Sequence, residues 1–569
     1  MDRLIKTTIV IALLFSTTIW SQKSVTNTIK DVSKTTNETI YIHTNATTFV
    51  TGETLYYKLY CLNSNDFKQS QLSKVAYVQL IGNDKKIIFN HKLFLENGTG
   101  QGDYFIPSSI LSGTYKLIGF TKWMLNKESS KSFEIDITVI NPFQNDGENL
   151  ISTKTEFLEN SSTINNYNVI KTDKITYSSR EKVNLNISNL QKGNYSISVR
   201  KTQDLPTVNK TNSVDFSKIG DNQSINFTNS NIVLPELRGE IISGKIAVKD
   251  NSKSINGITV ALSIPGKSFE FKLVKTDKNG QFIFSLDKPY YETNFAIQVL
   301  NDFKEYYTIT LDKPIYLDTS NLKIENGKKL SSDLKLIIEE HSIASQIENT
   351  FFEKKADTLQ KIKTYPPFYE PIATEYILDN YTRFPTIKET ITEVVKEMHY
   401  YKDNDKYTFY LADYDPNTEL TEPPLVLVDG LLIQDINELL EYRSSNIYKI
   451  CIIQSGYYYG NKIFNGVISF ITKKNDFNSN LSGNFILKTN ITPPLAKKSY
   501  YKPDYSDKTN NERIPDYRYQ LLWLPELKLN NDNQISFFTS DKTGNFEIVL
   551  EGFTEDGNPI SMKNYFEVK

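Results

Sequence analysis

Histidines, cysteines and paired carboxylates are the side chains through which this chain could catalyse a reaction or bind a metal. The four histidines form no H-E-x-x-H motif and lie far apart in the sequence, at His43, His91, His341 and His399. The run Asp277-Lys278-Asn279-Gly280 starts like a calcium loop but lacks the closing glutamate, which is typical of a hairpin turn. No G-x-S-x-G motif or phosphate-binding loop occurs. The sequence therefore predicts no catalytic residues, no metal site, no cofactor and no enzymatic activity.

The two cysteines allow two interpretations. Cys61 and Cys451 each lie inside a predicted strand, in distant parts of the chain. A long-range disulfide would require an oxidising compartment, whereas two separate buried thiols would not. The position of both residues within strands favours buried thiols.

A cluster of aromatic residues offers a candidate surface for protein contact. Tyr457, Tyr458 and Tyr459 precede a turn at Gly460, and Phe464 follows it. Aromatic side chains at the tip of a hairpin are favoured anchors for binding a partner. We therefore take these four aromatic residues as the predicted partner-binding site. The alternative is that they pack at the ends of strands against the core of their own domain.

Composition indicates a mainly β protein of several domains. The 569 residues include 35 Tyr and 32 Phe, which half-buried strands use. The 65 Lys and Arg nearly balance the 67 Asp and Glu, so the net charge of −2 gives no bulk attraction for nucleic acid or anionic lipid. The fold class expected is macroglobulin-like or immunoglobulin-like β-sandwiches, a small α+β domain and a short helical segment.

The N-terminal residues 1–22 have the layout of a secretory signal peptide, with a short basic start, an apolar run and small polar residues. A polar linker is expected at 23–37. No later stretch reaches 18 apolar residues, so no direct membrane span is expected. We expect the mature protein in the periplasm, associated with the outer membrane.

Residues 38–140 are predicted to form the first β-sandwich. Apolar residues alternate along one strand, where Leu55, Tyr57, Leu59 and Cys61 share a face. This strand and the closing Gly113-Thr114-Tyr115-Lys116-Leu117 resemble the second macroglobulin-type domain of the α2-macroglobulin family. Family members can trap proteases through a thioester whose cysteine lies in a Gly-Cys-x-Glu-Gln motif. That motif is absent, so the resemblance does not imply a covalent trap.

Two further β domains are predicted, and the second of them resembles a macroglobulin-type module. A second sandwich is expected at 166–231, because Gly193-Asn194-Tyr195-Ser196-Ile197 is similar to the closing strand of the first. A last β domain is expected at 495–569. Each of the two segments is interpreted as a separate domain.

The middle of the chain resembles a different β unit followed by a spacer. Residues 235–312 are similar to the carboxypeptidase regulatory-like domain, a seven-stranded sandwich that often precedes a receptor plug. Helical spacing of apolar residues at 333–355 and 386–399 predicts two helices. We interpret 313–402 as a helical or irregular spacer.

Residues 403–474 resemble the plug domain of TonB-dependent outer-membrane receptors. The resemblance rests on three stretches, 424–430, 447–453 and 459–472. An uninterrupted apolar run, 425–428, predicts a strand buried on both faces. It leads into a predicted turn at Asp429-Gly430, and further structural turns are expected at Gly460 and Gly466. A small α+β accessory domain that plugs nothing is the alternative.

A receptor plug normally lies inside a barrel of about 22 strands of about 10 residues each. Such a barrel needs more residues than follow position 474 in this sequence. We therefore expect a non-enzymatic periplasmic protein that docks on an outer-membrane β-barrel made by another polypeptide. It would plug or gate that pore, as in a type 9 protein-secretion translocon. The alternatives are a surface adhesin or scaffold, and an accessory protein of a TonB-dependent transporter. An inhibitory macroglobulin relative is disfavoured by the missing thioester motif.

Overall fold

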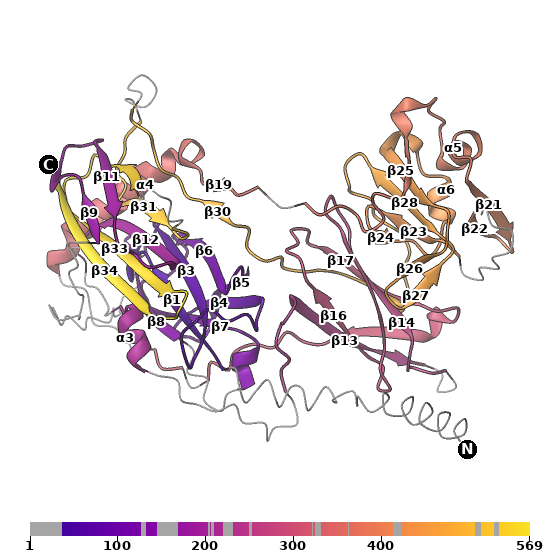
Figure 1. Ribbon diagram of the computed structural model, residues 1–569, viewed down its shortest axis with the longest axis horizontal. Coiled ribbons are helices and arrows are strands. Elements are labelled where there is room, and N and C mark those ends of the chain that lie inside the picture. Colours follow the sequence, from indigo (N-terminus) through magenta and orange to yellow (C-terminus); the bar gives the residue numbers. More distant parts are fainter. Residues whose placement is uncertain are drawn as a thin grey trace, which may run out of the picture.

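The computed structural model describes residues 37–126, 133–144, 169–202, 205, 210–219, 232–249, 253–320, 322–324, 332–361, 364–412, 423–506, 514–527 and 534–569. The expected signal peptide at 1–22 lies outside the described residues, as does the linker up to residue 36. The described chain consists of three β-sandwiches and a smaller domain built on a mixed sheet. This confirms the prediction of a mainly β, multi-domain protein. Figure 1 shows an elongated molecule, with two sandwiches at one end and the third sandwich and the smaller domain at the other.

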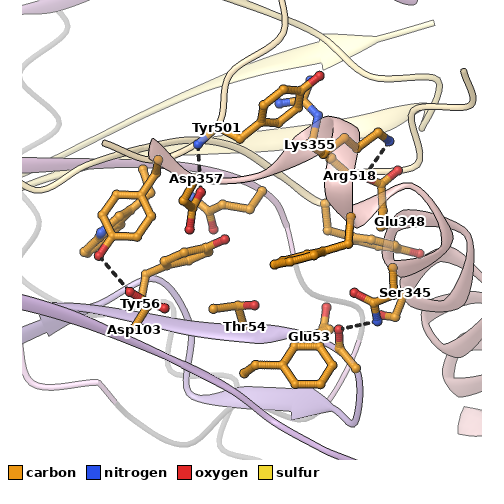
Figure 2. A pocket seen from close by; sticks show the side chains of 18 of the residues that line it. Glu53, Thr54, Tyr56, Asp103, Ser345, Glu348, Lys355, Asp357, Tyr501 and Arg518 are labelled. Atoms are coloured by element: carbon orange, nitrogen blue, oxygen red, sulfur yellow. Dashed lines mark hydrogen bonds and ion pairs between the residues drawn. The ribbon is translucent and has the colours of Figure 1, made fainter. Parts of the chain in front are cut away.

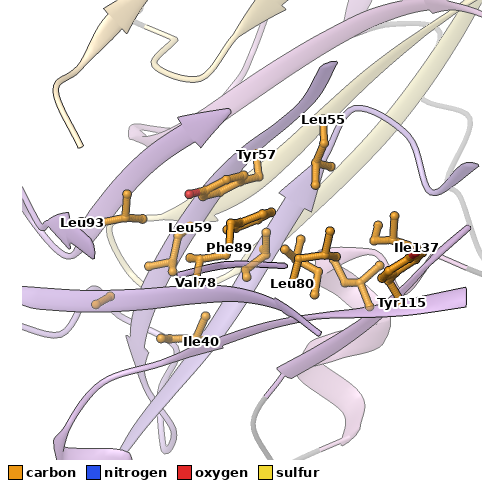
Figure 3. Close-up of a cluster of buried hydrophobic side chains, with 14 of the residues drawn as sticks. Ile40, Leu55, Tyr57, Leu59, Val78, Leu80, Phe89, Leu93, Tyr115 and Ile137 are labelled. Carbon is orange, nitrogen blue, oxygen red and sulfur yellow. The ribbon is translucent and has the colours of Figure 1, made fainter. Parts of the chain in front are cut away.

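The first sandwich packs a three-stranded sheet against a five-stranded sheet. The smaller sheet has the order β1 (Glu38–Thr44), β3 (Thr54–Asn63), β6 (Thr99–Phe105). The larger has the order β2 (Thr48–Val50), β8 (Phe133–Ile140), β7 (Gly113–Phe120), β4 (Val75–Ile81), β5 (Ile87–Phe94). Leu55, Tyr57 and Leu59 of β3 face Val78 and Leu80 of β4 in the core (Figure 3). Each such side chain contributes about 1.5–3 kcal/mol when fully buried.

The second face of β3 is also buried, because another sandwich covers it. Lys58 is 2% exposed and Tyr60 is fully buried. The Tyr60 hydroxyl lies 2.9 Å from Ser196 Oγ and donates to the Glu551 carbonyl at 3.1 Å. Strand β3 therefore packs against its own sandwich on one face and against the second sandwich on the other.

The second sandwich is built from two segments that lie far apart in the sequence. Its larger sheet has the order β10 (Thr176–Tyr177), β34 (Pro559–Val568), β33 (Gly544–Thr554), β12 (Gly193–Lys201), β31 (Gln520–Leu524). Its smaller sheet has the order β32 (Gln534–Phe538), β11 (Lys182–Ile187), β9 (Ile170–Thr172). The prediction of separate domains at 166–231 and 495–569 is therefore wrong. Neither segment can close a sandwich alone, since β12 pairs with β31 and β33 on its two edges.

The third sandwich also takes a strand from later in the chain. One sheet has the order β16 (Gln281–Leu286), β13 (Glu240–Val248), β18 (Tyr307–Leu311). The other has the order β15 (Glu270–Lys275), β14 (Thr259–Ile264), β17 (Asn294–Leu300), β29 (Ile486–Asn490). Strand β29 pairs antiparallel with β17, from Asn294 opposite Asn490 to Gln298 opposite Ile486. The sandwich expected at 235–312 is therefore completed by residues beyond that range.

The smaller domain, here called the distal domain, comprises residues 364–412 and 423–477. Its sheet has the order β20 (Thr374–Ile377), β25 (Ile447–Ile453), β28 (Val467–Thr472), β23 (Leu425–Val428), β24 (Leu431–Leu432). Around the sheet lie α5 (Ile387–Glu393), α6 (Asn437–Leu440) and the hairpins β21 (Met398–Asp403) with β22 (Lys406–Leu411), and β26 (Tyr457–Tyr459) with β27 (Lys462–Phe464).

The segment 313–402 is not a spacer, which corrects the sequence interpretation. Its strand β20 pairs with β25, and α5 packs in the core of the distal domain. Thr386 is the N-cap of helix α5, and its side chain accepts a hydrogen bond from Glu389 N. The helix predicted over 386–399 ends at Glu393, because Met398 enters the hairpin with its side chain fully buried.

Helix α4 (Lys335–Thr350) instead covers the junction of the first and second sandwiches. Its Ile337 and Ile338 pack against Val50 of β2 and Ile140 of β8. Further along, β19 (Thr358–Leu359) pairs with β30 (Lys498–Ser499), and α3 (Ser213–Ile219) packs on β34. The chain thus crosses between the two ends of the molecule more than once.

The buried carboxylate of Glu53 connects the first sandwich with the second sandwich and with helix α4. Glu53, whose side chain is 8% exposed, lies 2.8 Å from Arg200 of β12 and 3.4 Å from His341 of α4. Its other oxygen accepts from Val50 N at 2.8 Å. Burial opposes ionisation, but Arg200, His341 and the Val50 amide outweigh it and lower the pKa of Glu53 to about 2.

We expect Glu53→Gln to destabilise the protein by about 3 kcal/mol at neutral pH, because Arg200 loses its buried partner. The carboxylate's contribution is present above pH 4.5, the ordinary pKa of glutamate, and is lost as the pH falls toward 2. Urea unfolding should be measured from pH 7 downward. The difference in free energy of unfolding between variant and wild type should become smaller as the pH falls from 4.5 toward 2. Asp66→Asn, which removes an exposed ion pair with Lys68, should change stability little at any pH. A difference for Glu53→Gln that is constant through the window would contradict this role.

Candidate docking surface

The predicted partner-binding residues lie on the hairpin β26–β27, which folds back onto the third sandwich. The Tyr459 ring stacks on Phe271 of β15 at 5.3 Å between centroids, and its hydroxyl donates to the Phe271 carbonyl. The Tyr457 hydroxyl donates to the Phe368 carbonyl at 2.9 Å. Both tyrosines therefore serve packing within the molecule.

The prediction that all four aromatic residues form an exposed cluster is wrong. Phe464 is 4% exposed, and Tyr457 and Tyr459 are half-buried. Tyr458 is 77% exposed, because alternation along β26 turns it away from its two neighbours. Of the predicted residues, only Tyr458 is available to a partner.

The predicted turn residues lie where the chain bends around the distal sheet. Asp429 (φ 51°) and Gly430 (φ 87°) join β23 to β24. The Asp429 carboxylate accepts from Thr472 N at 2.7 Å and Thr472 Oγ1 at 2.6 Å. Its burial raises the pKa of Asp429. Gly460 (φ 60°) turns the hairpin β26–β27, and Gly466 (φ 95°) precedes β28.

Both faces of the distal sheet are covered. On one face, Val428, Ile450 and Phe470 pack in a core shared with α5, α6 and β22. On the other, Leu427 and Cys451 pack against the third sandwich. A partner must therefore bind the outside of this domain and not its sheet.

The outer hairpin β21–β22 offers such a surface. His399, Tyr401 and Tyr410, here called the hairpin ladder, lie on its outward side, with Tyr401 51% and Tyr410 43% exposed. The Tyr410 ring centroid is 5.2 Å from His399 and 6.0 Å from Tyr401. The inward side chains Met398 and Phe409 are buried in the core. Figure 1 places this hairpin at the end of the molecule away from the first two sandwiches.

The sequence contained a signal for this hairpin that the interpretation as a spacer missed. Residues 398–411 alternate between inward apolar and outward side chains around Asn404-Asp405. Both turn residues have positive φ, at 46° and 68°, as two-residue hairpin turns require.

Metal-binding clusters and membrane-spanning helices are both absent from the part of the chain that the structure describes. No group of three or more His, Cys, Asp or Glu side chains among those residues is arranged to hold a metal ion. None of the helices described is long and apolar enough to cross a membrane. Cys61 is buried in the first sandwich and Cys451 in the distal domain, where burial raises the Cys451 pKa to about 12.

Comparison with known proteins finds similarity only at the level of solved structures. No protein-family model and no curated protein matches the chain. A mutant of Salmonella alpha-2-macroglobulin is 9% identical with a TM-score of 0.24, over 93% of this chain and 39% of that one. Escherichia coli alpha-2-macroglobulin activated by porcine elastase is 9% identical with a TM-score of 0.24, over 94% of this chain and 44% of that one. The chain thus spans less than half the length of these two proteins.

Gly430→Ala should destabilise the contact between the distal domain and the third sandwich by about 3 kcal/mol. A Cβ at this position would lie 2.2 Å from Phe269 Cγ, and the backbone φ of 87° is strained for alanine. Hydrogen exchange measured by mass spectrometry should show faster opening of β23 and β28.

Gly257→Ala is the matched control. Its φ is 74° but no atom lies within 4 Å of the added Cβ, so only backbone strain of about 1 kcal/mol is expected. Equal effects of the two substitutions on β23 and β28 would contradict the packing argument.

Proposed function

We propose that this protein is a non-enzymatic, periplasmic component that docks on an outer-membrane β-barrel formed by another polypeptide and plugs or gates it. The distal domain is the plug-like element and the hairpin ladder is its contact surface. A protein-secretion translocon of the type 9 class is the host that we propose. The third sandwich lies between the distal domain and the first two sandwiches (Figure 1).

The arrangement of the plug-like stretches supports this proposal. The three stretches that resemble a receptor plug form β23, β25 and β28, which are neighbours in one sheet. Strands β23 and β28 run parallel, with Leu425 opposite Val467. The resemblance therefore falls on one folded unit and is not scattered over several domains.

The observation that carries the proposal is that the sheet of this unit is covered on both faces, while the hairpin ladder still presents aromatic side chains on its outside. Since both sheet faces are covered, the domain does not require a barrel of its own chain to bury its apolar area. The hairpin ladder leaves two tyrosines exposed on a hairpin whose inner side is fixed in the core. Tyrosines on a rigid support are favoured binding anchors because they lose little conformational entropy.

The double variant Tyr401→Ala and Tyr410→Ala should reduce recovery of an outer-membrane β-barrel partner by about tenfold or more. The assay is affinity isolation from detergent-solubilised outer membranes, followed by mass spectrometry. Tyr565→Ala serves as control, since Tyr565 is 46% exposed on β34, in the second sandwich. It should leave recovery unchanged.

Two results would count against the proposal. Wild-type protein isolated without any β-barrel partner would contradict docking. Cleavage of the protein by a protease added to intact cells would place it on the surface, as expected of an adhesin or scaffold. A periplasmic plug should be protected.

A further inference from the structure

A cavity of about 900 Å³ lies where the first sandwich, the second sandwich and α4 meet. Its walls come from the start of β3, the end of β6, the strand β31, helix α4 and the segments that flank β19 and β30. Figure 2 shows side chains from these elements directed into one open space. A volume of this size is typical of a ligand pocket.

Aromatic side chains form one wall of the cavity. The Tyr56 ring meets Tyr500 edge to face at 4.9 Å and stacks with Trp523 at 6.1 Å between centroids. The faces of such rings carry negative potential and attract cations.

The mouth of the cavity has exposed apolar side chains. Phe105 is 47%, Phe352 66% and Leu359 58% exposed. They come from three separate elements and line a single cavity. Together they provide apolar area for a ligand that extends beyond the aromatic wall.

One carboxylate of the lining forms no ion pair with a residue that the structure describes, although Lys498, which is paired with Asp103, also attracts it. Four cationic side chains of the lining are each paired with a carboxylate at 2.7–2.8 Å: Arg200 with Glu53, Lys498 with Asp103, Lys355 with Glu348 and Arg518 with Asp516. Asp357 has no ion pair with any residue that the structure describes. One of its oxygens accepts from Tyr501 N at 2.9 Å. Burial raises the pKa of Asp357 by more than the Tyr501 amide and Lys498 lower it, and a bound cation would lower it further.

We propose that this cavity binds an extended peptide segment through an arginine or lysine side chain of that peptide. The cation lies against the faces of Tyr56 and Tyr500 and pairs with Asp357, which Figure 2 shows beside the Tyr56 ring. Apolar residues of the same peptide cover Phe105, Phe352 and Leu359. The proposal is independent of docking by the distal domain.

The size and lining of the cavity favour a peptide over a free amine. A lone ammonium or guanidinium group would occupy the aromatic wall and Asp357 but leave the apolar mouth uncovered. An extended peptide presents side chains alternately, so a basic residue can enter while its neighbours contact the mouth.

The test measures binding of fluorescein-labelled short peptides to the full chain by fluorescence polarisation. One probe has a central arginine flanked by leucine and phenylalanine, and the other has neutral citrulline in place of arginine. The wild type should prefer the arginine probe by about tenfold or more. Asp357→Asn should abolish this preference, while its amide oxygen still accepts from Tyr501 N.

Asp84→Asn, at an exposed turn of the first sandwich, is the matched control and should retain the preference for the arginine probe.

Leu359→Ala should weaken the binding of both probes about fivefold, because it removes apolar contact at the mouth of the cavity. Since Leu359 is exposed, this variant should fold as the wild type does, which a thermal melt checks. Equal binding of the two probes to the wild type, or a preference that survives Asp357→Asn, would overturn the proposal. Binding of N-acetylarginine methylamide as tight as that of the arginine peptide would exclude a peptide occupant.

Discussion

The pairing of β12 with β33 is the constraint on which the rest of the architecture depends. Nine consecutive pairs join Gly193–Lys201 to Thr554–Phe546, strands separated by most of the chain. Everything between them must leave the second sandwich and return to it. The third sandwich repeats this arrangement, because β17 pairs with β29, which follows the distal domain in the sequence. The distal domain is thus inserted in the third sandwich, and both are inserted in the second. Pairings of such long sequence separation form slowly, since loop closure opposes them until the late strands are present.

Local patterns in the sequence predicted strands well but not their partners. Alternation along β3 correctly assigned Leu55, Tyr57 and Leu59 to one core. The similarity of Gly193–Ile197 to the closing strand of the first sandwich predicted a complete sandwich at 166–231, but a local pattern indicates a strand and not which strand lies beside it. The segment 313–402 was misinterpreted for a related reason. Its helices were visible as periodic patterns, but α4 and α5 pack against elements that lie far away in the sequence.

The candidate surface shows the same division between local and distant information. The Asp429-Gly430 turn was predictable, because the dipeptide itself favours positive φ. The aromatic run at 457–459 was not correctly assigned, although alternation alone excludes three consecutive strand residues from sharing one surface. Which side is buried depends on Phe271 of the third sandwich, a contact with no local signal. The cavity beside Asp357 could not be predicted either, since its walls come from segments spread over the whole chain.

The contacts of the distal domain limit how a plug-like element could move. Its sheet packs on Phe271 and Ala261 of the third sandwich, and Gln298 Nε2 donates to the Leu432 carbonyl at 2.8 Å. Separating the two would expose the apolar area that they bury between them, which is costly. The third sandwich meets the first through polar contacts instead, including Lys92 at 2.5 Å from Glu240. Such an interface exchanges its hydrogen bonds with water at lower cost than an apolar one. If the distal domain moves to open or close a pore, it therefore moves together with the third sandwich as one body, and the polar junction with the first sandwich is where that movement takes place.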